Sequence, residues 1–451
     1  MTRSRAGGQD RLVPWREAAV VLLLALLTLP AFAVGTQFWT SATYEDFARG
    51  NFKSVSLGRE GSMTLSPALE QVLDTEQALI WAVARDSRDN IFLGTGHSGK
   101  VFRLGPDLKG SLVFDAAEPD VFALAVDKDD RLYVATSPDG KIYRVDASGQ
   151  SSEFFDPKTK YIWSMTFAPD GALYVGTGDR GRIFRVRADG AGDVFYETHQ
   201  AHIMSLAVTP QGELIAGTEP NGLLYKISGE GKAFVLYDSP LAEIHQVSLG
   251  PDGSVYAATL GTGDARPLRQ APQQPSGSPV PVQAATTITV RASDDLLQVP
   301  GPQGGAEDQP NQPQQDPSGS AAVAIGAAQR VAATTPRSQQ GGPSRSAIVR
   351  VHPDSTVETL WTSPAENAFD LTPSGGRLLF STDEKGRIYE LANERELSLL
   401  TQTDQEQTTR LIPMRNFVLV TTANLGKVFR LGADPAAGGS FESDVRDAGN
   451  L

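Results

Sequence analysis

The sequence contains no cysteine and only 5 histidines in 451 residues. Disulfides, thiolate metal sites and cysteine nucleophiles are therefore excluded. The signatures HExxH and GxSxG do not occur either, so the usual motifs of zinc and serine hydrolases are missing. From its motifs we predict no catalytic residue, no metal site and no cofactor.

Basic residues are fewer than acidic residues. The chain has 40 Lys and Arg against 53 Asp and Glu, which gives a formal net charge of −13. Proteins that bind nucleic acid place clustered Lys and Arg against the phosphates, and no basic stripe of that kind is seen. We therefore predict no nucleic-acid partner.

The most prominent apolar run lies near the N-terminus, at residues 18–34, and four arginines precede it: Arg3, Arg5, Arg11 and Arg16. A basic region, an apolar region and the small residues of Ala31-Phe32-Ala33 form the pattern of a secretory signal. Residues 1–33 are thus a cleaved signal peptide or an uncleaved membrane anchor. Both alternatives predict an extracytoplasmic protein, either periplasmic or secreted, or tethered to the inner membrane.

An eleven-residue pattern occurs seven times in the chain: a small residue and Thr, a turn with Gly, then a strand such as KVFRL. The copies begin at Gly94, Ala135, Gly176, Gly217, Ala258, Ser381 and Thr421. The first five starts are 41 residues apart, which is the length of a four-stranded propeller blade.

The unit from Val121 to Phe155 illustrates the blade. The apolar run at 121–126 predicts an inner strand covered on both faces. Residues 131–136 and 141–145 predict the next two strands, because each follows a turn sequence, and the fourth begins at residue 153. The chain is therefore predicted to be all-β, a seven-bladed β-propeller.

The repeat divides the rest of the sequence into segments. Residues 34–52 are expected to be a linker, residues 53–262 blades one to five, residues 346–431 blades five to seven and residues 432–451 a C-terminal tail. Ser54–Leu57 and Ser62–Leu65 resemble the third and fourth strands of a unit. We therefore expect the N-terminal segment to complete the last blade and to close the ring.

Residues 263–345 interrupt the fifth unit. This segment holds twelve of the 29 prolines and no Phe, Trp or Tyr. Such a composition cannot bury enough apolar surface to offset the entropy of ordering, so it predicts a disordered insertion between the second and third strands of blade five.

Asp-Gly hairpins together with LYVAT, LYVGT, KIYRV and RIFRV resemble bacterial extracytoplasmic propellers of the NHL-repeat, gluconolactonase-like and two-component-sensor groups. The resemblance covers about residues 53–431. It implies the architecture and not one activity, since this fold serves sensors, binding scaffolds and hydrolases.

Two segments, at 94–99 and 176–181, match GxGxxG, the expression for dinucleotide binding. That site needs a helix after the glycines, whereas here a strand follows, so both are interpreted as hairpin turns. The basic residues after the turn glycine are interpreted as part of the repeat on a solvated strand face: Lys100, Lys141, Arg182, Arg387 and Lys427.

Functional residues are expected in the loops that lead into the inner strands and in those between strands two and three, because both lie at one end of the ring. The candidate ligand-binding residues are His97, Asp139, Asp179, Arg180, His202, Glu219, Asn221 and Glu243. His199 and His202 have a spacing that suits a metal on a helix, but on a strand the two would face opposite sides.

Two functions remain open. The first is an exported, non-enzymatic binding or interaction scaffold, with a protein, peptide or glycan as its ligand. The alternative is a gluconolactonase-like metal-dependent hydrolase, whose carboxylates would activate water through a divalent cation. That resemblance implies carboxylates on strands along the channel, but the inner strands IWAVA, VFALAV and IWSMTF have none.

Overall fold

A computed structural model of the chain describes residues 43–146, 148–229, 231–261, 344–374, 376–393 and 395–442. The expected signal or anchor segment at 1–33 lies outside the described residues. So do nearly all of the expected disordered insertion at 263–345 and the end of the tail.

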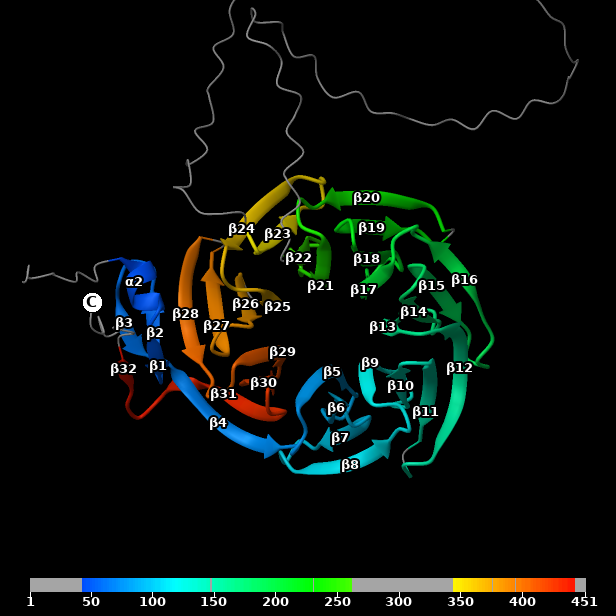
Figure 1. The fold of residues 1–451 in the computed structure, drawn as a ribbon, viewed down its shortest axis with the longest axis horizontal. Coiled ribbons are helices and arrows are strands. Elements are labelled where there is room, and N and C mark those ends of the chain that lie inside the picture. Colours follow the sequence, from blue (N-terminus) through cyan, green and yellow to red (C-terminus); the bar gives the residue numbers. More distant parts are fainter. Residues whose placement is uncertain are drawn as a thin grey trace, which may run out of the picture.

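The described part of the chain is all-β apart from one short helix, and its sheets are arranged in a ring (Figure 1). Four of the sheets have four strands that are consecutive in sequence. The first contains β9 (Asp120–Val126), β10 (Leu132–Ser137), β11 (Gly140–Val145) and β12 (Ser151–Thr159). The second contains β13 (Ile162–Phe167), β14 (Leu173–Thr177), β15 (Arg182–Val186) and β16 (Gly192–Glu197). The third contains β17 (His202–Val208), β18 (Leu214–Glu219), β19 (Leu223–Ile227) and β20 (Ala233–Asp238). The fourth contains β21 (Glu243–Leu249), β22 (Val255–Leu260), β23 (Ser346–Val351) and β24 (Val357–Ser363).

The remaining sheets include strands from the N-terminal segment. One consists of β25 (Ala368–Ser374), β26 (Arg377–Thr382), β27 (Arg387–Ala392), β28 (Glu396–Gln402), β2 (Val55–Gly58) and β3 (Met63–Leu65). Another joins β4 (Pro67–Asp74), β31 (Lys427–Pro435), β30 (Val418–Ala423) and β29 (Gln407–Pro413) to β5 (Leu79–Arg85), β6 (Ile91–Gly96), β7 (Lys100–Leu104) and β8 (Gly110–Asp115). A single residue pair, Leu79 with Ala423, connects its two halves. The short strands β1 (Asn51–Lys53) and β32 (Ser440–Glu442) pair with each other.

The first strand of each unit faces the centre of the ring. These inner strands are β5, β9, β13, β17, β21, β25 and β29, and each contacts the next until β29 meets β5 again (Figure 1). In the unit from Val121 to Phe155, strands β9 to β12 lie where the sequence predicted them. The all-β architecture of a β-propeller is therefore confirmed. No helix among the described residues is long and apolar enough to cross a membrane.

The small residue that begins each repeat allows neighbouring sheets to approach. A Cβ on Gly94 would lie 2.6 Å from a methyl carbon of Val121, which belongs to the next inner strand. Gly176 stands in the same relation to Ile203, at 2.7 Å. The buried Val121 and Ile203 therefore pack directly on the backbone of the preceding sheet.

The glycine inside each repeat has a different role. Gly99 adopts φ +63°, and a Cβ there would lie 2.1 Å from the carbonyl oxygen of Glu118. Gly181 is similar, with φ +53° and a carbonyl oxygen of Gln200 at 2.5 Å from the added Cβ. Strand β7 or β15 follows within a residue, so the interpretation of both GxGxxG segments as hairpin turns is confirmed.

The N-terminal segment joins the end of the chain, but through a strand other than those expected. Strand β4 pairs with β31 and completes the sheet of β29, β30 and β31. The expected strands at 54–57 and 62–65 instead correspond to β2 and β3, and β2 is added to the outer edge of β28. Their alternating pattern fits the edge of any sheet, so it could not show which unit they join.

Residues 34–52, expected to be a linker, contain α2 (Tyr44–Ala48) and β1. Thr43 caps α2 through a capping box with Asp46. The helix lies over the six-stranded sheet, where Tyr44 and Phe47 pack against its hydrophobic core. Residues 43–52 are therefore part of the fold, since they cover one outer face of the ring.

The packing of α2 on this sheet explains why Arg387 does not lie on a solvated strand face, as its repeat position predicted. Arg387 occupies the basic position of its repeat, but only 4% of it is exposed. Its guanidinium donates to Glu366 Oε1 at 2.7 Å and to the carbonyl oxygen of Ala48 at the end of α2. Tyr389 donates to the same Glu366 oxygen at 2.9 Å. Burial, with the nearby charge of Glu366, raises the pKa of Tyr44 to about 12.

Candidate functional site: the mouth and the axial cavity

The predicted loop residues lie at one end of the ring. In each unit the start of the inner strand pairs with the end of the second strand, as His202 pairs with Glu219. The turns between second and third strands therefore lie at the end where the inner strands begin. We call this end the mouth.

The structure brings three of the eight predicted residues together. His202 begins β17, Glu219 ends β18 opposite it, and Glu243 begins the neighbouring inner strand β21. Burial, with the nearby charge of Glu243, raises the pKa of Glu219. His245, which the sequence reasoning did not select, accompanies this group, and its Nδ1 lies 2.6 Å from Glu243 Oε1.

The other predicted residues are distributed around the mouth. The backbone N–H of His97 donates to Asp120, and Asp179 accepts from the backbone of Lys160. Asp139 lies in the turn between β10 and β11. Asn221 donates to Gln200 at 2.8 Å. Among the described residues, the Arg180 side chain makes no hydrogen bond or ion pair with the other seven candidates, so the set does not form one cluster.

A continuous row of rings crosses one side of the mouth. Its members are Trp81, Phe122, Trp163, Tyr161 and His202, and we call it the aromatic belt. Ring centroids of Phe122 and Trp163 are 4.8 Å apart, and those of Tyr161 and Trp163 are 5.0 Å apart with nearly parallel planes. The Trp163 indole N–H donates to His202 Nδ1 at 3.0 Å. All five side chains are only partly buried, so the belt is exposed at the mouth, where Lys160 Nζ lies 5.0 Å from the Tyr161 ring centroid.

Bulges in the inner strands position the belt. Every inner strand has a bulge next to the residue that pairs with the first residue of the repeat. In β13, for example, Ser164 pairs with Gly176 and Ile162 with Thr177, which leaves Trp163 unpaired between them. Trp163 is the extra residue at this bulge, as Trp81 and Phe122 are at theirs. A bulge redirects the extra side chain, so these rings lie at the mouth and the following residue lines the axis.

The residues after the bulge form one layer around the axis. They are Ala82, Ala123, Ser164, Ser205, Gln246, Asp370 and Arg410. Four successive inner strands thus contribute Ala or Ser, and the other three contribute long polar side chains. The small residues leave a cavity of about 340 Å³ on the axis.

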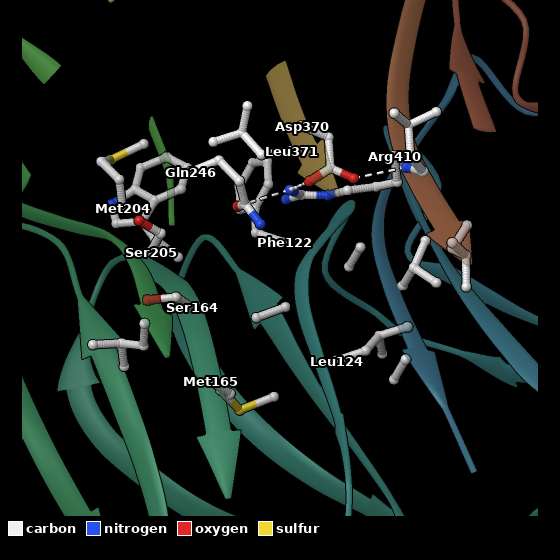
Figure 2. Close-up of a pocket in the computed structure, with 18 of the residues that line it drawn as sticks. Phe122, Leu124, Ser164, Met165, Met204, Ser205, Gln246, Asp370, Leu371 and Arg410 are labelled. Atoms are coloured by element: carbon white, nitrogen blue, oxygen red, sulfur yellow. Dashed lines mark hydrogen bonds and ion pairs between the residues drawn. The ribbon is translucent and has the colours of Figure 1, made fainter. Parts of the chain in front are cut away.

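Three polar side chains converge on one wall of this cavity, and Figure 2 shows Gln246, Asp370 and Arg410 pointing toward one another. Arg410 Nη1 donates to Gln246 Oε1 at 3.0 Å and lies 3.7 Å from Asp370 Oδ1. Arg410 Nε donates to the carbonyl oxygen of Trp81 at 2.9 Å. We call these three residues the polar wall.

Asp370 is the most buried member of the polar wall. Its Oδ2 accepts from the backbone N–H of Leu411 at 2.7 Å. Burial raises the pKa of its carboxyl, and the charge of Arg410 lowers this pKa by a smaller amount. Strand β25 therefore places a buried carboxylate on the axis, unlike the inner strands IWAVA, VFALAV and IWSMTF.

No protein-family model and no curated protein matches the chain. Solved structures with the same fold do match, at low identity. Virginiamycin B lyase from Staphylococcus aureus is 12% identical with a TM-score of 0.56, over 81% of this chain and 99% of the lyase. YCF48, solved bound to the D1 peptide, is 11% identical with a TM-score of 0.50, over 83% of this chain and 98% of that chain.

A third match is the extracellular domain of a putative one component system from B. thetaiotaomicron. It is 14% identical with a TM-score of 0.51, over 84% of this chain and 44% of that chain. At such identities the comparisons establish the fold alone. The resemblance to propellers of bacterial sensors is thereby confirmed at the level of the fold.

The hydrolase alternative requires side chains that hold a metal ion. Among the residues that the structure describes, no group of three or more His, Cys, Asp or Glu is placed so that it could hold a metal ion. The hydrolase alternative gains no support from this part of the chain.

Proposed function

We propose that the protein is an extracytoplasmic, non-enzymatic scaffold, a seven-bladed propeller whose mouth binds a basic peptide segment of a partner protein. The observation that carries this proposal is the aromatic belt with carboxylates beside it. Lys and Arg side chains are attracted both to aromatic faces and to carboxylates. The mouth supplies both groups within one surface.

The charge of the mouth supports a basic ligand rather than an acidic one. Four of the eight loop candidates are carboxylates, namely Asp139, Asp179, Glu219 and Glu243, and only one is an arginine. The raised pKa of Glu219 reflects partly desolvated carboxylates that repel each other. A cationic side chain between Glu219 and Glu243 would relieve that repulsion.

Binding to arrays of basic, neutral and acidic peptides tests this function, with the full chain and two variants. We expect the basic peptides to bind, and Trp163→Ala to weaken binding about tenfold or more, as expected for an interface anchor. Phe234→Ala is the matched control, because Phe234 is an aromatic residue that is 61% exposed on the outer strand β20.

Glu219→Gln with Glu243→Gln is a second test that leaves the belt intact. It should weaken binding of the basic peptides and reduce the dependence of their affinity on salt. The proposal fails if no basic peptide binds, or if Phe234→Ala weakens binding as much as Trp163→Ala does.

A further inference from the structure

The axial cavity has the form of a small-molecule site. Its lining runs from Phe122 and Trp163 near the mouth to Arg85 and Pro413 at the opposite ends of β5 and β29. Pockets for small molecules measure about 300–1,000 Å³, so a cavity of about 340 Å³ accommodates roughly one ring.

The cavity is layered along the axis. Along the inner strands, the layer that holds the polar wall comes after Phe122 and before Leu124 and Met165, all three of which line the cavity. Figure 2 shows Leu124 and Met165 well away from the polar wall. A ring that lies across the axis would therefore have apolar groups above and below it. Its edge would meet the polar wall on one side.

The polar wall has unused hydrogen-bonding capacity. Gln246 uses its oxygen toward Arg410, and neither its side-chain N–H groups nor Arg410 Nη2 has a partner among the described residues. The Asp370 carboxyl accepts from the backbone of Leu411 and Leu371, and its Oδ1 is 3.7 Å from the guanidinium, which is beyond hydrogen-bond length. On another side of the cavity the Ser205 hydroxyl is turned toward Gly217 and is not open to the cavity. Unpaired donors of Gln246 and Arg410 therefore line one wall of a space of about one ring.

The charge of the wall points to a neutral ligand. Arg410 is offset by Asp370, so neither an anion nor a cation would find an uncompensated opposite charge. The wall provides donors from Arg410 and Gln246 and an acceptor from Asp370. Hydroxyl groups donate and accept at once and match such a mixed set.

From these features we propose that the axial cavity binds one pyranose ring of a neutral sugar. The C–H faces of the ring lie toward Phe122 and toward Leu124, and the hydroxyls at its edge bind Gln246, Asp370 and Arg410. This site lies below the aromatic belt and does not depend on the peptide proposed for the mouth.

Isothermal titration of the full chain with glucose, galactose, mannose and N-acetylglucosamine tests the proposal. At least one sugar should bind in the millimolar range or tighter. Ala123→Leu, which fills the cavity without changing the wall, should abolish this binding. Gln246→Leu should weaken it at least tenfold, because a hydrogen-bonding side chain of the polar wall is lost.

Glu219→Gln is the control, because Glu219 lies at the mouth and does not line the cavity. It should leave sugar binding unchanged, so that failure of the peptide proposal and failure of the sugar proposal are distinguishable. Adenine and uracil form a comparison series, since a planar heterocycle also has apolar faces and a polar edge. The proposal is overturned if no sugar binds, if Ala123→Leu binds sugar like the parent, or if the heterocycles bind in place of the sugars.

Discussion

The buried ion pair under α2 predicts a large loss of stability when its cation is removed. Arg387→Met keeps most of the side-chain volume but leaves Glu366 buried, where 8% of that residue is exposed. The variant also loses the bond to the carbonyl oxygen of Ala48. Breaking a buried pair on one side costs about 3–5 kcal/mol, because an uncompensated charge stays inside.

Arg182→Met is the matched control for this change. Arg182 occupies the same repeat position on β15, and its Nε lies 3.4 Å from Glu197 with the two side chains 30% and 42% exposed. Such a surface pair contributes about 0–1 kcal/mol. At about 2 °C per kcal/mol for a domain of this size, Arg387→Met should lower the melting temperature by roughly 6–10 °C, and Arg182→Met by less than roughly 2 °C.

Differential scanning calorimetry of the parent, both single variants and Arg387→Met with Glu366→Leu measures these shifts. The double variant should recover part of the loss, because it removes the stranded carboxylate together with its partner. Equal shifts for Arg387→Met and Arg182→Met, or a double variant no more stable than Arg387→Met, would refute the argument.

Three further changes test the fold and the mouth. Leu57→Ala removes a fully buried side chain of β2 and should cost about 2–5 kcal/mol in urea unfolding, whereas Leu65→Ala, at a residue 46% exposed, should cost under about 0.5 kcal/mol; equal costs would contradict the packing of β2 on β28. Gly99→Ala should destabilise the protein by about 1–3 kcal/mol, because its Cβ would meet a carbonyl oxygen in a turn of positive φ, and a neutral result would exclude that turn. The pKa of Glu219 is higher in the folded than in the unfolded protein. The free energy of unfolding therefore falls as the pH rises between these two pKa values. Glu219→Gln should therefore raise the free energy of unfolding at pH 7, by less than about 1 kcal/mol for a partly exposed group, and have no effect below about pH 4; an effect that is larger at low pH would reverse the sign of the reasoning.

The ring itself could be predicted from the sequence because each repeat carries its own local physical cause. Gly99 is required by a turn of positive φ, and Gly94 by the approach of the next inner strand. Such causes act within one unit or between neighbours, so they recur with the period. Contacts between distant segments do not recur. The burial of Arg387 depends on α2, more than 300 residues away in the chain, and no periodic pattern announces it.

The mouth residues were found only in part for a related reason. The sequence places His202, Glu219 and Glu243 at one end of the ring, since strand order alone determines which end a loop joins. It does not show which loops meet across the ring. It also gave no reason to select Trp163 or Phe122, because an aromatic residue in an apolar inner strand is usually a core residue. The bulge that turns these rings toward the mouth becomes visible only in the strand register.

The polar wall, in contrast, was accessible from the sequence. In each inner strand, one residue pairs with the first residue of the repeat. This position holds Ala or Ser in four strands, and Gln246, Asp370 and Arg410 in the other three. A repeat that only builds a ring has no need for a carboxylate, an amide and a guanidinium at one level of its axis. Burying them has a cost that close packing of small residues would avoid. The departure from the repeat is therefore best explained by a ligand, and the cavity beside the polar wall provides its place.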